Sequence, residues 1–86
     1  MNVTRRTAAE KLAGYLHHDL SLEALVDWAE SAMMEGEFEE EDLNVLRDVV
    51  ARLGLADVRA FGLTWEDCEQ MLKGLGYAVR VEIEAA

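Results

Sequence analysis

The sequence predicts a mainly α-helical fold, a compact bundle of about four short helices with a β-strand at the C-terminus. In four segments, apolar residues recur at spacings of three and four, which is typical of amphipathic helices. From Tyr77 to Glu84, apolar residues instead alternate with polar or small ones, which is typical of a half-buried strand. A chain of 86 residues has room for one hydrophobic core. We therefore expect a single helical domain over residues 1–86.

The first two helices are delimited by polar capping residues and by glycine. The first is expected to begin at Thr7, because the sequence TAAE places Glu10 at the spacing of a capping box, and to end in the HHD sequence at 17–19. The second is expected to have Ser21 as its N-cap and to end at Gly36. Its predicted buried face consists of Leu22, Leu25, Val26, Ala29, Ala32 and Met33.

The third helix is expected to start within an acidic stretch, EGEFEEEDL. With Glu39 as the N-cap, residues 40–42 fill the first turn, where the helix dipole favours negative charge. The helix is expected to end at Gly54. Its predicted buried face consists of Leu43, Leu46, Val49, Val50 and Leu53.

The fourth helix is expected to open with a second capping box, formed by Thr64 and Asp67, and to end at Gly74 and Gly76. Its predicted inner face consists of Trp65, Cys68, Met71, Leu72 and Leu75. Before it, the sequence ADVRAFG favours a single helical turn that ends at Gly62 over a short strand.

The C-terminal strand needs a neighbour, because a single strand leaves its backbone hydrogen-bonding groups unpaired. Within the chain, it pairs either with the N-terminus, MNVT, or with the 57–61 segment. Otherwise it pairs with a second copy of the chain, giving a homodimer, or with another protein by strand addition.

Acidic residues are concentrated in one part of the chain. The net charge is −10, from 18 acidic and 8 basic residues. Between Leu12 and Leu46 there are ten acids and no lysine or arginine, whereas the other 51 residues hold eight of each sign. We refer to residues 12–46 as the base-free segment. Because self-repulsion of like charges lowers stability, this segment favours binding to a basic protein partner. A solvated surface that keeps the protein soluble is the alternative.

The candidate interaction surface lies within this segment. Glu23, Asp27 and Glu30 share one face of the second helix. Trp28 either flanks the core or is an exposed aromatic anchor of the kind found at interface hot spots. The expected partner-binding residues are Glu23, Asp27, Trp28, Glu30, Glu35, Glu37, Glu39, Glu40 and Glu41.

No catalytic or metal-binding pattern is recognisable in the sequence. The acids of EGEFEEEDL lack the spacing of a calcium-binding loop. His17 and His18 are adjacent, so on a helix they point about 100° apart and do not chelate one metal ion. Cys68 is expected to be buried, and the acids beside it raise the pKa of a thiol. We therefore expect no enzymatic activity, no metal and no cofactor.

The composition also bears on the compartment. The acidic balance argues against direct binding to nucleic acid and against binding to anionic membranes. No run approaches the roughly 20 apolar residues of a membrane span, and the N-terminus lacks the continuous apolar region of a signal peptide. A single cysteine fits a reducing environment. We expect a cytoplasmic protein.

Two stretches resemble known proteins. YLHHDLSLEALVDWAESAM, followed by an acidic connection and further elements, resembles many small uncharacterised bacterial proteins. In size, acidity and helical character the chain is similar to colicin- and pyocin-type immunity proteins, which use acidic surfaces to block basic nuclease toxins. MLKGLGYAVRVE resembles the helix-to-strand step of HicA-type toxins, without the Gly-Ser-His segment of that family. These resemblances carry over no individual functional residue.

The sequence therefore predicts a small acidic interaction module that binds, and thereby inhibits, a basic protein partner, as an immunity protein or antitoxin does. The alternative is a non-catalytic structural or assembly module that forms a homodimer through its C-terminal strand.

Overall fold

The computed structural model describes residues 1–58 and 62–80, and the predicted mainly helical fold is confirmed for this part of the chain. The elements, in chain order, are β1 (Asn2–Val3), α1 (Arg5–Leu16), α2 (Leu22–Glu35), β2 (Glu37–Phe38), α3 (Leu43–Gly54) and α4 (Trp65–Gly74).

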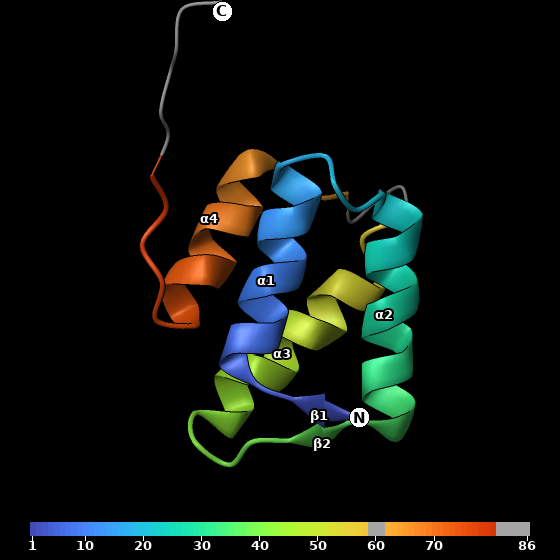
Figure 1. Cartoon of the computed structure of the whole chain (residues 1–86), viewed down its shortest axis with the longest axis vertical. Helices are drawn as coiled ribbons and strands as arrows, with labels where there is room; N and C mark the ends of the chain where they lie inside the picture. The colour runs from blue at the N-terminus through green and yellow to red at the C-terminus, as the bar shows by residue number, and fades with distance from the viewer. Residues whose placement is uncertain (59–61, 81–86) are drawn as a thin grey trace, which may run out of the picture.

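The four helices pack around one core. α1 lies between α4 and α2, and the short sheet closes one end of the molecule (Figure 1). The most extensive helix contact is between α2 and α3, whereas α4 packs mainly against α1. The largest fully buried side chains are those of Leu12, Leu25, Leu46, Leu53 and Leu75. Every helix therefore contributes to the core, and α4 does so through Cys68 and Leu72 and through Leu75 at its C-cap.

The N-cap of α1 lies three residues before the predicted one, Thr7. It is Thr4, whose side chain accepts a hydrogen bond from the Thr7 backbone N–H, so Thr7 lies inside the first turn. Glu10 does not cap the helix and instead forms an ion pair with Arg6. The start is earlier because Thr4 directly follows β1, and its backbone is extended, as an N-cap requires.

α2 begins and ends as predicted. Ser21 accepts a hydrogen bond from the Ala24 N–H, and Gly36 is the C-cap. The central residues of the predicted buried face, Leu25, Val26, Ala29 and Ala32, are buried. Met33 is 49% exposed, because it lies at the edge of that face near the end of the helix.

β1 and β2 form a two-stranded parallel sheet in which Asn2 is opposite Glu37 and Val3 is opposite Phe38. This sheet replaces the predicted start of α3. Glu39 is not an N-cap, since its own N–H donates to the carbonyl oxygen of Val3.

Residues 40–42 do not fill the first turn of α3. The helix starts at Leu43, after Asp42, which has a φ of 54° and makes no side-chain capping bond. The predicted buried face of α3 is correct from Leu46 to Leu53, and Leu43 is half-buried.

α4 opens with the predicted capping box between Thr64 and Asp67. It ends in a Schellman motif, in which Tyr77 N–H donates to the Leu72 carbonyl and Gly76 N–H to the Lys73 carbonyl. Gly76 has a φ of 93°, a conformation that side chains disfavour, which explains the glycine. Cys68, Leu72 and Leu75 are buried as predicted. Trp65 is 46% exposed because it is the first residue of the helix, so it does not belong to the inner face.

The C-terminal strand is not present in the part that the structure describes. Residues 77–80 are irregular, and residues 81–84 lie outside the described residues. The N-terminus, one predicted neighbour, pairs with β2 instead. In the 57–61 segment, residue 57 belongs to a turn, and residues 59–61 lie outside the described residues.

Candidate protein-interaction surface

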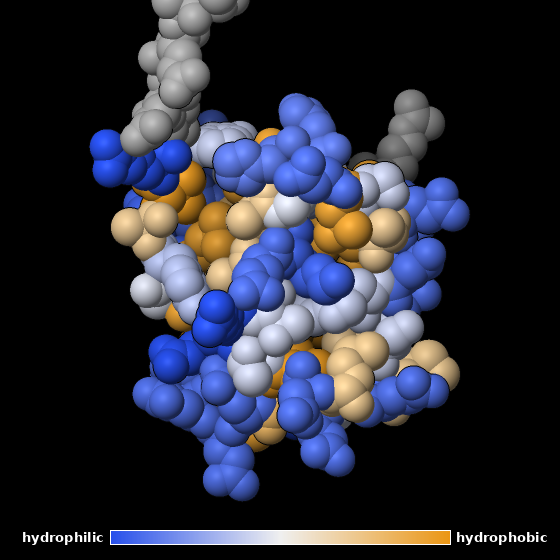
Figure 2. Space-filling model, in the orientation of Figure 1, coloured by the Kyte–Doolittle hydropathy of each residue, from blue (hydrophilic) through white to orange (hydrophobic). Residues whose placement is uncertain are grey.

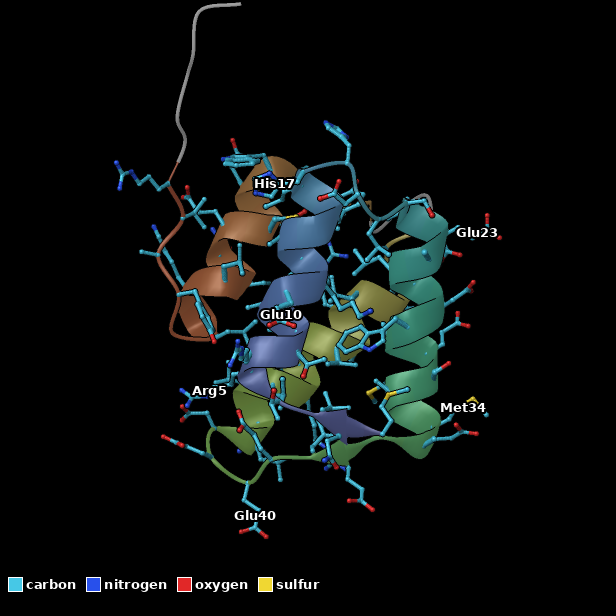
Figure 3. All side chains as sticks on the ribbon, in the orientation of Figure 1. Arg5, Glu10, His17, Glu23, Met34 and Glu40 are labelled. Atoms are coloured by element: carbon cyan, nitrogen blue, oxygen red, sulfur yellow. The ribbon has the colours of Figure 1, made fainter. Side chains whose placement is uncertain are left out.

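One face of α2 is both acidic and exposed to solvent. Glu23, Asp27 and Glu30 lie at i, i+4 and i+7, and each is exposed. Met34 continues the same face three turns after Glu23 and is 83% exposed. Figure 3 shows Glu23 and Met34 on the outer side of α2, away from the other helices. We define the α2 outer face as Glu23, Asp27, Glu30 and Met34.

The acids of the α2 outer face form no ion pair with any residue that the structure describes. α2 itself carries no lysine or arginine. Residues three and four positions apart on a helix have Cβ atoms about 5–6 Å apart, so these acids contribute to a common negative potential. This face can therefore attract cations without first breaking an internal contact.

The acids that follow β2 are held differently. Arg5 Nε lies 3.1 Å from Glu39 Oε1, its Nη2 lies 3.4 Å from Glu41 Oε2, and its Nη1 lies 3.6 Å from Asp42 Oδ2. One arginine from the start of α1 thus binds three carboxylates of the base-free segment. Sequence reasoning missed Arg5, because it lies more than thirty residues from its partners; the available signal was the adjacent pair Arg5–Arg6.

Glu39 also serves as a helix cap, but for α1. Its Oε1 accepts a hydrogen bond of 2.8 Å from the Arg5 backbone N–H, one of the first-turn N–H groups that have no partner within the helix. Negative charge at this point also complements the positive end of the α1 dipole. The prediction that Glu39 is the N-cap of the third helix is therefore wrong, and its carboxylate instead accepts a hydrogen bond from the first turn of α1.

These contacts change the pKa of both partners. The Arg5 backbone N–H, with the Arg5 side chain adding to it, lowers the pKa of Glu39 below its usual value of 4.5, while partial burial acts in the opposite direction. The hydrogen bond with Glu39, supported by the nearby Glu41, raises the pKa of Arg5. A lowered carboxylate pKa in the folded state stabilises the fold above the unfolded pKa, and this stabilisation is lost as the pH falls through the folded pKa.

The Glu39→Gln variant tests this linkage. We expect it to be less stable than the parent at neutral pH, because the amide keeps a hydrogen-bond acceptor but loses the charge. The difference in unfolding free energy should shrink as the pH falls below 4.5. Urea unfolding between about pH 3 and about pH 7 measures it. Glu40→Gln is the control, since Glu40 is exposed and forms no ion pair among the described residues; an equal pH dependence for both variants would contradict the role of Glu39.

Two other bases border the base-free segment in space. Lys11 Nζ lies 5.9 Å from the centroid of the Trp28 ring, and Arg47 Cζ lies 5.8 Å from that of Phe38. Both distances suit cation–π contacts. Trp28 is half-buried and packs against the core, so it flanks the core as the first of the two expectations had it. The segment therefore lacks bases in sequence but has Arg5, Lys11 and Arg47 at its margins.

The nine predicted partner-binding residues consequently fall into separate groups. Glu23, Asp27 and Glu30 belong to the α2 outer face, and Glu35 is exposed at the C-terminal end of α2, about 18 Å further along the axis than Glu23. Four of the remaining residues lie in β2 or just after it, and the fifth, Trp28, lies on α2 under the Lys11 side chain. Glu37 and Glu40 are exposed, and Glu39 and Glu41 bind Arg5. Glu40 lies at the sheet end of the molecule, and its side chain points outward, away from the helices (Figure 3).

The cysteine and the two histidines form no reactive or metal-binding group among the described residues. Cys68 is buried as predicted, and burial, with the nearby Asp67 adding to it, raises the pKa of its thiol. His17 and His18 are exposed at the end of α1. Over residues 1–58 and 62–80, no three His, Cys, Asp or Glu side chains are arranged to hold a metal ion. None of the helices in the same ranges combines the length and hydropathy that crossing a membrane requires.

No protein-family model, curated protein or solved structure matches this chain significantly.

Proposed function

We propose that this protein is a small, non-catalytic interaction module that binds a basic protein partner through the α2 outer face. The observation that carries the proposal is the contrast between two sets of acids. Glu39, Glu41 and Asp42 are engaged by Arg5, whereas Glu23, Asp27 and Glu30 are exposed and have no ion-pair partner among the described residues.

The proposed mechanism is electrostatic steering followed by steric occlusion. An uncompensated acidic face raises the association rate with a basic surface by about 10- to 1,000-fold. Met34, which projects from the same face, then supplies an adaptable apolar contact that acids alone do not provide. A partner covered in this way would be inhibited if its basic surface is its working surface, as in the immunity proteins that this chain resembles in size and acidity.

The test is a triple variant, Glu23→Gln, Asp27→Asn and Glu30→Gln. Immobilised parent protein should retain a basic protein from native cell extract at about 20 mM salt and release it at about 500 mM salt, where charges are screened over only a few ångströms. The triple variant should retain little of it. With that protein purified, stopped-flow measurements should show association about 10-fold slower for the variant at low salt, with a weaker salt dependence.

A matched triple variant distinguishes the effect of the α2 outer face on binding from the effect of the net charge. Asp48→Asn, Asp57→Asn and Glu66→Gln remove three exposed acids outside α2 that form no ion pair among the described residues. If this variant loses the partner equally, total charge and not the α2 outer face governs binding. If association with the parent protein is equally fast at low and high salt, electrostatic steering is wrong.

Homodimerisation through a C-terminal strand, the other function expected from the sequence, has no supporting observation among the described residues. The described part of that segment, 77–80, is irregular. Light scattering on the parent protein distinguishes the two functions, because the proposed module needs only one copy of the chain.

A further inference from the structure

A groove of about 610 Å³ lies on the other side of the molecule from α2. α1 forms one wall, residues 77–80 form the opposite wall, and α4 lies at its base. Ala9 and Ala13, one turn apart on α1, leave room for the groove because their side chains are small. The Schellman motif positions the opposite wall, since it turns the chain back beside α4. In Figure 2, apolar residues are exposed at the left of the view, between α1 and the 77–80 segment.

The lining of the groove is mainly apolar and partly aromatic. Leu16, Leu72 and Val79 line it together with the two alanines. Trp65 and Tyr77, which are 46% and 40% exposed, add two aromatic side chains. Both rings therefore have apolar surface in contact with water that a ligand could cover.

Trp65 also lines a second cavity. This cavity, of about 380 Å³, shares Leu16 and Trp65 with the groove, and Tyr15, Leu63 and Cys68 lie on its far side. The indole of Trp65 thus stands between two hollows, and a ligand in either would contact it. Since Trp65 is the first residue of α4, only one side of it is flanked by the helix.

The charged side chains at the groove are already engaged. Arg6 and Glu10 form an ion pair with each other, with 3.1 Å between Nε and Oε1. Arg80 has an interaction partner of its own. His17, the C-cap of α1, is exposed to solvent. A charged ligand would lose hydration without gaining an uncommitted counter-charge from Arg6, Glu10 or Arg80, so the groove suits an uncharged occupant.

The size of the groove and the charge of the chain favour a small molecule over a protein. Volumes of about 300–1,000 Å³ with mostly apolar walls are typical of small-molecule sites. Two copies of a chain with a net charge of −10 repel each other, which opposes a second copy as the occupant. The basic partner proposed above is attracted to the α2 outer face, on the other side of the molecule.

We infer that this groove binds an uncharged, mainly aromatic small molecule. Its rings would lie along Ala9 and Ala13 and against Trp65 and Tyr77, burying apolar surface on both sides. The ion pair between Arg6 and Glu10 would stay intact. This site is independent of the α2 outer face, so either can be lost without the other.

The probe is N-phenyl-1-naphthylamine, an uncharged dye, and anilinonaphthalene sulfonate is its negatively charged counterpart. The chain has two tryptophans, so Trp28→Phe leaves Trp65 as the sole donor for energy transfer to a bound dye. We expect one uncharged dye per chain with quenching of Trp65, and binding of the sulfonate dye that is weaker by at least about 3-fold. Equal or tighter binding of the sulfonate dye would contradict an uncharged ligand.

A variant that fills the groove tests the location. Ala13→Leu should weaken the uncharged dye at least about 10-fold, because the larger side chain occupies the space of the ligand. Ala51→Leu makes the same change at an exposed position of α3 and should leave the affinity unchanged. Unchanged binding to Ala13→Leu, or equal loss in both leucine variants, would overturn the proposal.

A second variant keeps the test valid if Ala13→Leu does not fold. Trp65→Ala removes one aromatic wall and should weaken the uncharged dye by about 3- to 10-fold, measured by the fluorescence of the dye. Trp28→Phe alters the other tryptophan, which lies outside the groove, and should change the affinity by less than about 2-fold. The same affinity for Trp65→Ala and the parent would refute the proposed contact.

Other occupants of the groove give different results. If the parent chain is a dimer that Ala13→Leu dissociates, the groove is an interface between copies, and the inference is wrong. It is also wrong if the full chain binds neither dye.

Discussion

Replacing Gly36 by alanine is expected to lower the free energy of unfolding by about 1–3 kcal/mol, the usual cost of overpacking. A Cβ at this position would meet the carbonyl oxygen of Ala32 and lie 2.6 Å from Val3 Cγ2. Val3 is fully buried and its backbone is fixed by pairing with β2, so it cannot move without disturbing the sheet. Urea unfolding followed by circular dichroism measures the loss.

Gly54→Ala is the matched control for Gly36→Ala. A Cβ at Gly54 would lie 4.0 Å from Ala29 Cβ, which is ordinary contact, and alanine is the better helix former. Its stability should equal or exceed that of the parent. A double-mutant cycle with Val3→Ala should show positive coupling, because trimming Val3 removes one of the two clashes. Equal stability of Gly36→Ala and the parent would show that the end of α2 is not packed tightly against β1.

Features governed by local chemistry were predictable from the sequence. Ser21 and Thr64 cap the helices that follow them, and Gly76 terminates α4, because each depends on hydrogen bonds within a few residues. The buried faces of α2 and α3 were predictable because helical periodicity places their residues together regardless of the remaining fold. The error at Met33, which is 49% exposed, concerns a residue at the edge of its face near the end of α2.

Features that depend on distant parts of the chain were not predictable in this way. Both Thr4 and Thr7 are suitable N-caps, and the pairing of β1 with β2 decides between them by keeping Thr4 extended. Similarly, Glu39 is a suitable cap for α3 by sequence, yet it caps α1, whose first residue lies 34 positions away. Two-residue strands such as β1 and β2 are too short to show the alternation that identifies a strand.

The number of acids in the base-free segment could be read from the sequence, but their arrangement on the surface could not. Sequence counting treats the ten acids between Leu12 and Leu46 as equivalent. In the fold, Arg5 draws three of them together, because the parallel sheet places the start of α1 beside the residues that follow β2. The α2 outer face is left with its charges uncompensated by any ion pair among the described residues. For this reason, the candidate interaction surface contains fewer acids than the nine-residue set predicted from the sequence.

The largest loss of stability is expected for Leu25→Ala, which should cost about 2–5 kcal/mol, the range for a leucine removed from a packed core. Leu25 is fully buried on α2, the helix whose contact with α3 is the most extensive in the described structure. A domain of this size has about 4–13 kcal/mol of total stability, so the variant should have a much lower unfolding midpoint. If the stability of the parent is at the lower end of this range, the variant should not accumulate as a folded protein at 37 °C.

Met33→Ala tests whether burial or position on the helix determines this cost. Both residues belong to the apolar face predicted for α2, but Met33 is 49% exposed, so its truncation should cost less than about 1 kcal/mol. Because these two variants lie on one helix and replace side chains of similar size, helix propensity affects them to a similar degree. Equal losses would mean that Met33 is buried in solution, and a small loss for Leu25→Ala would mean that the α2–α3 contact is not the centre of the core.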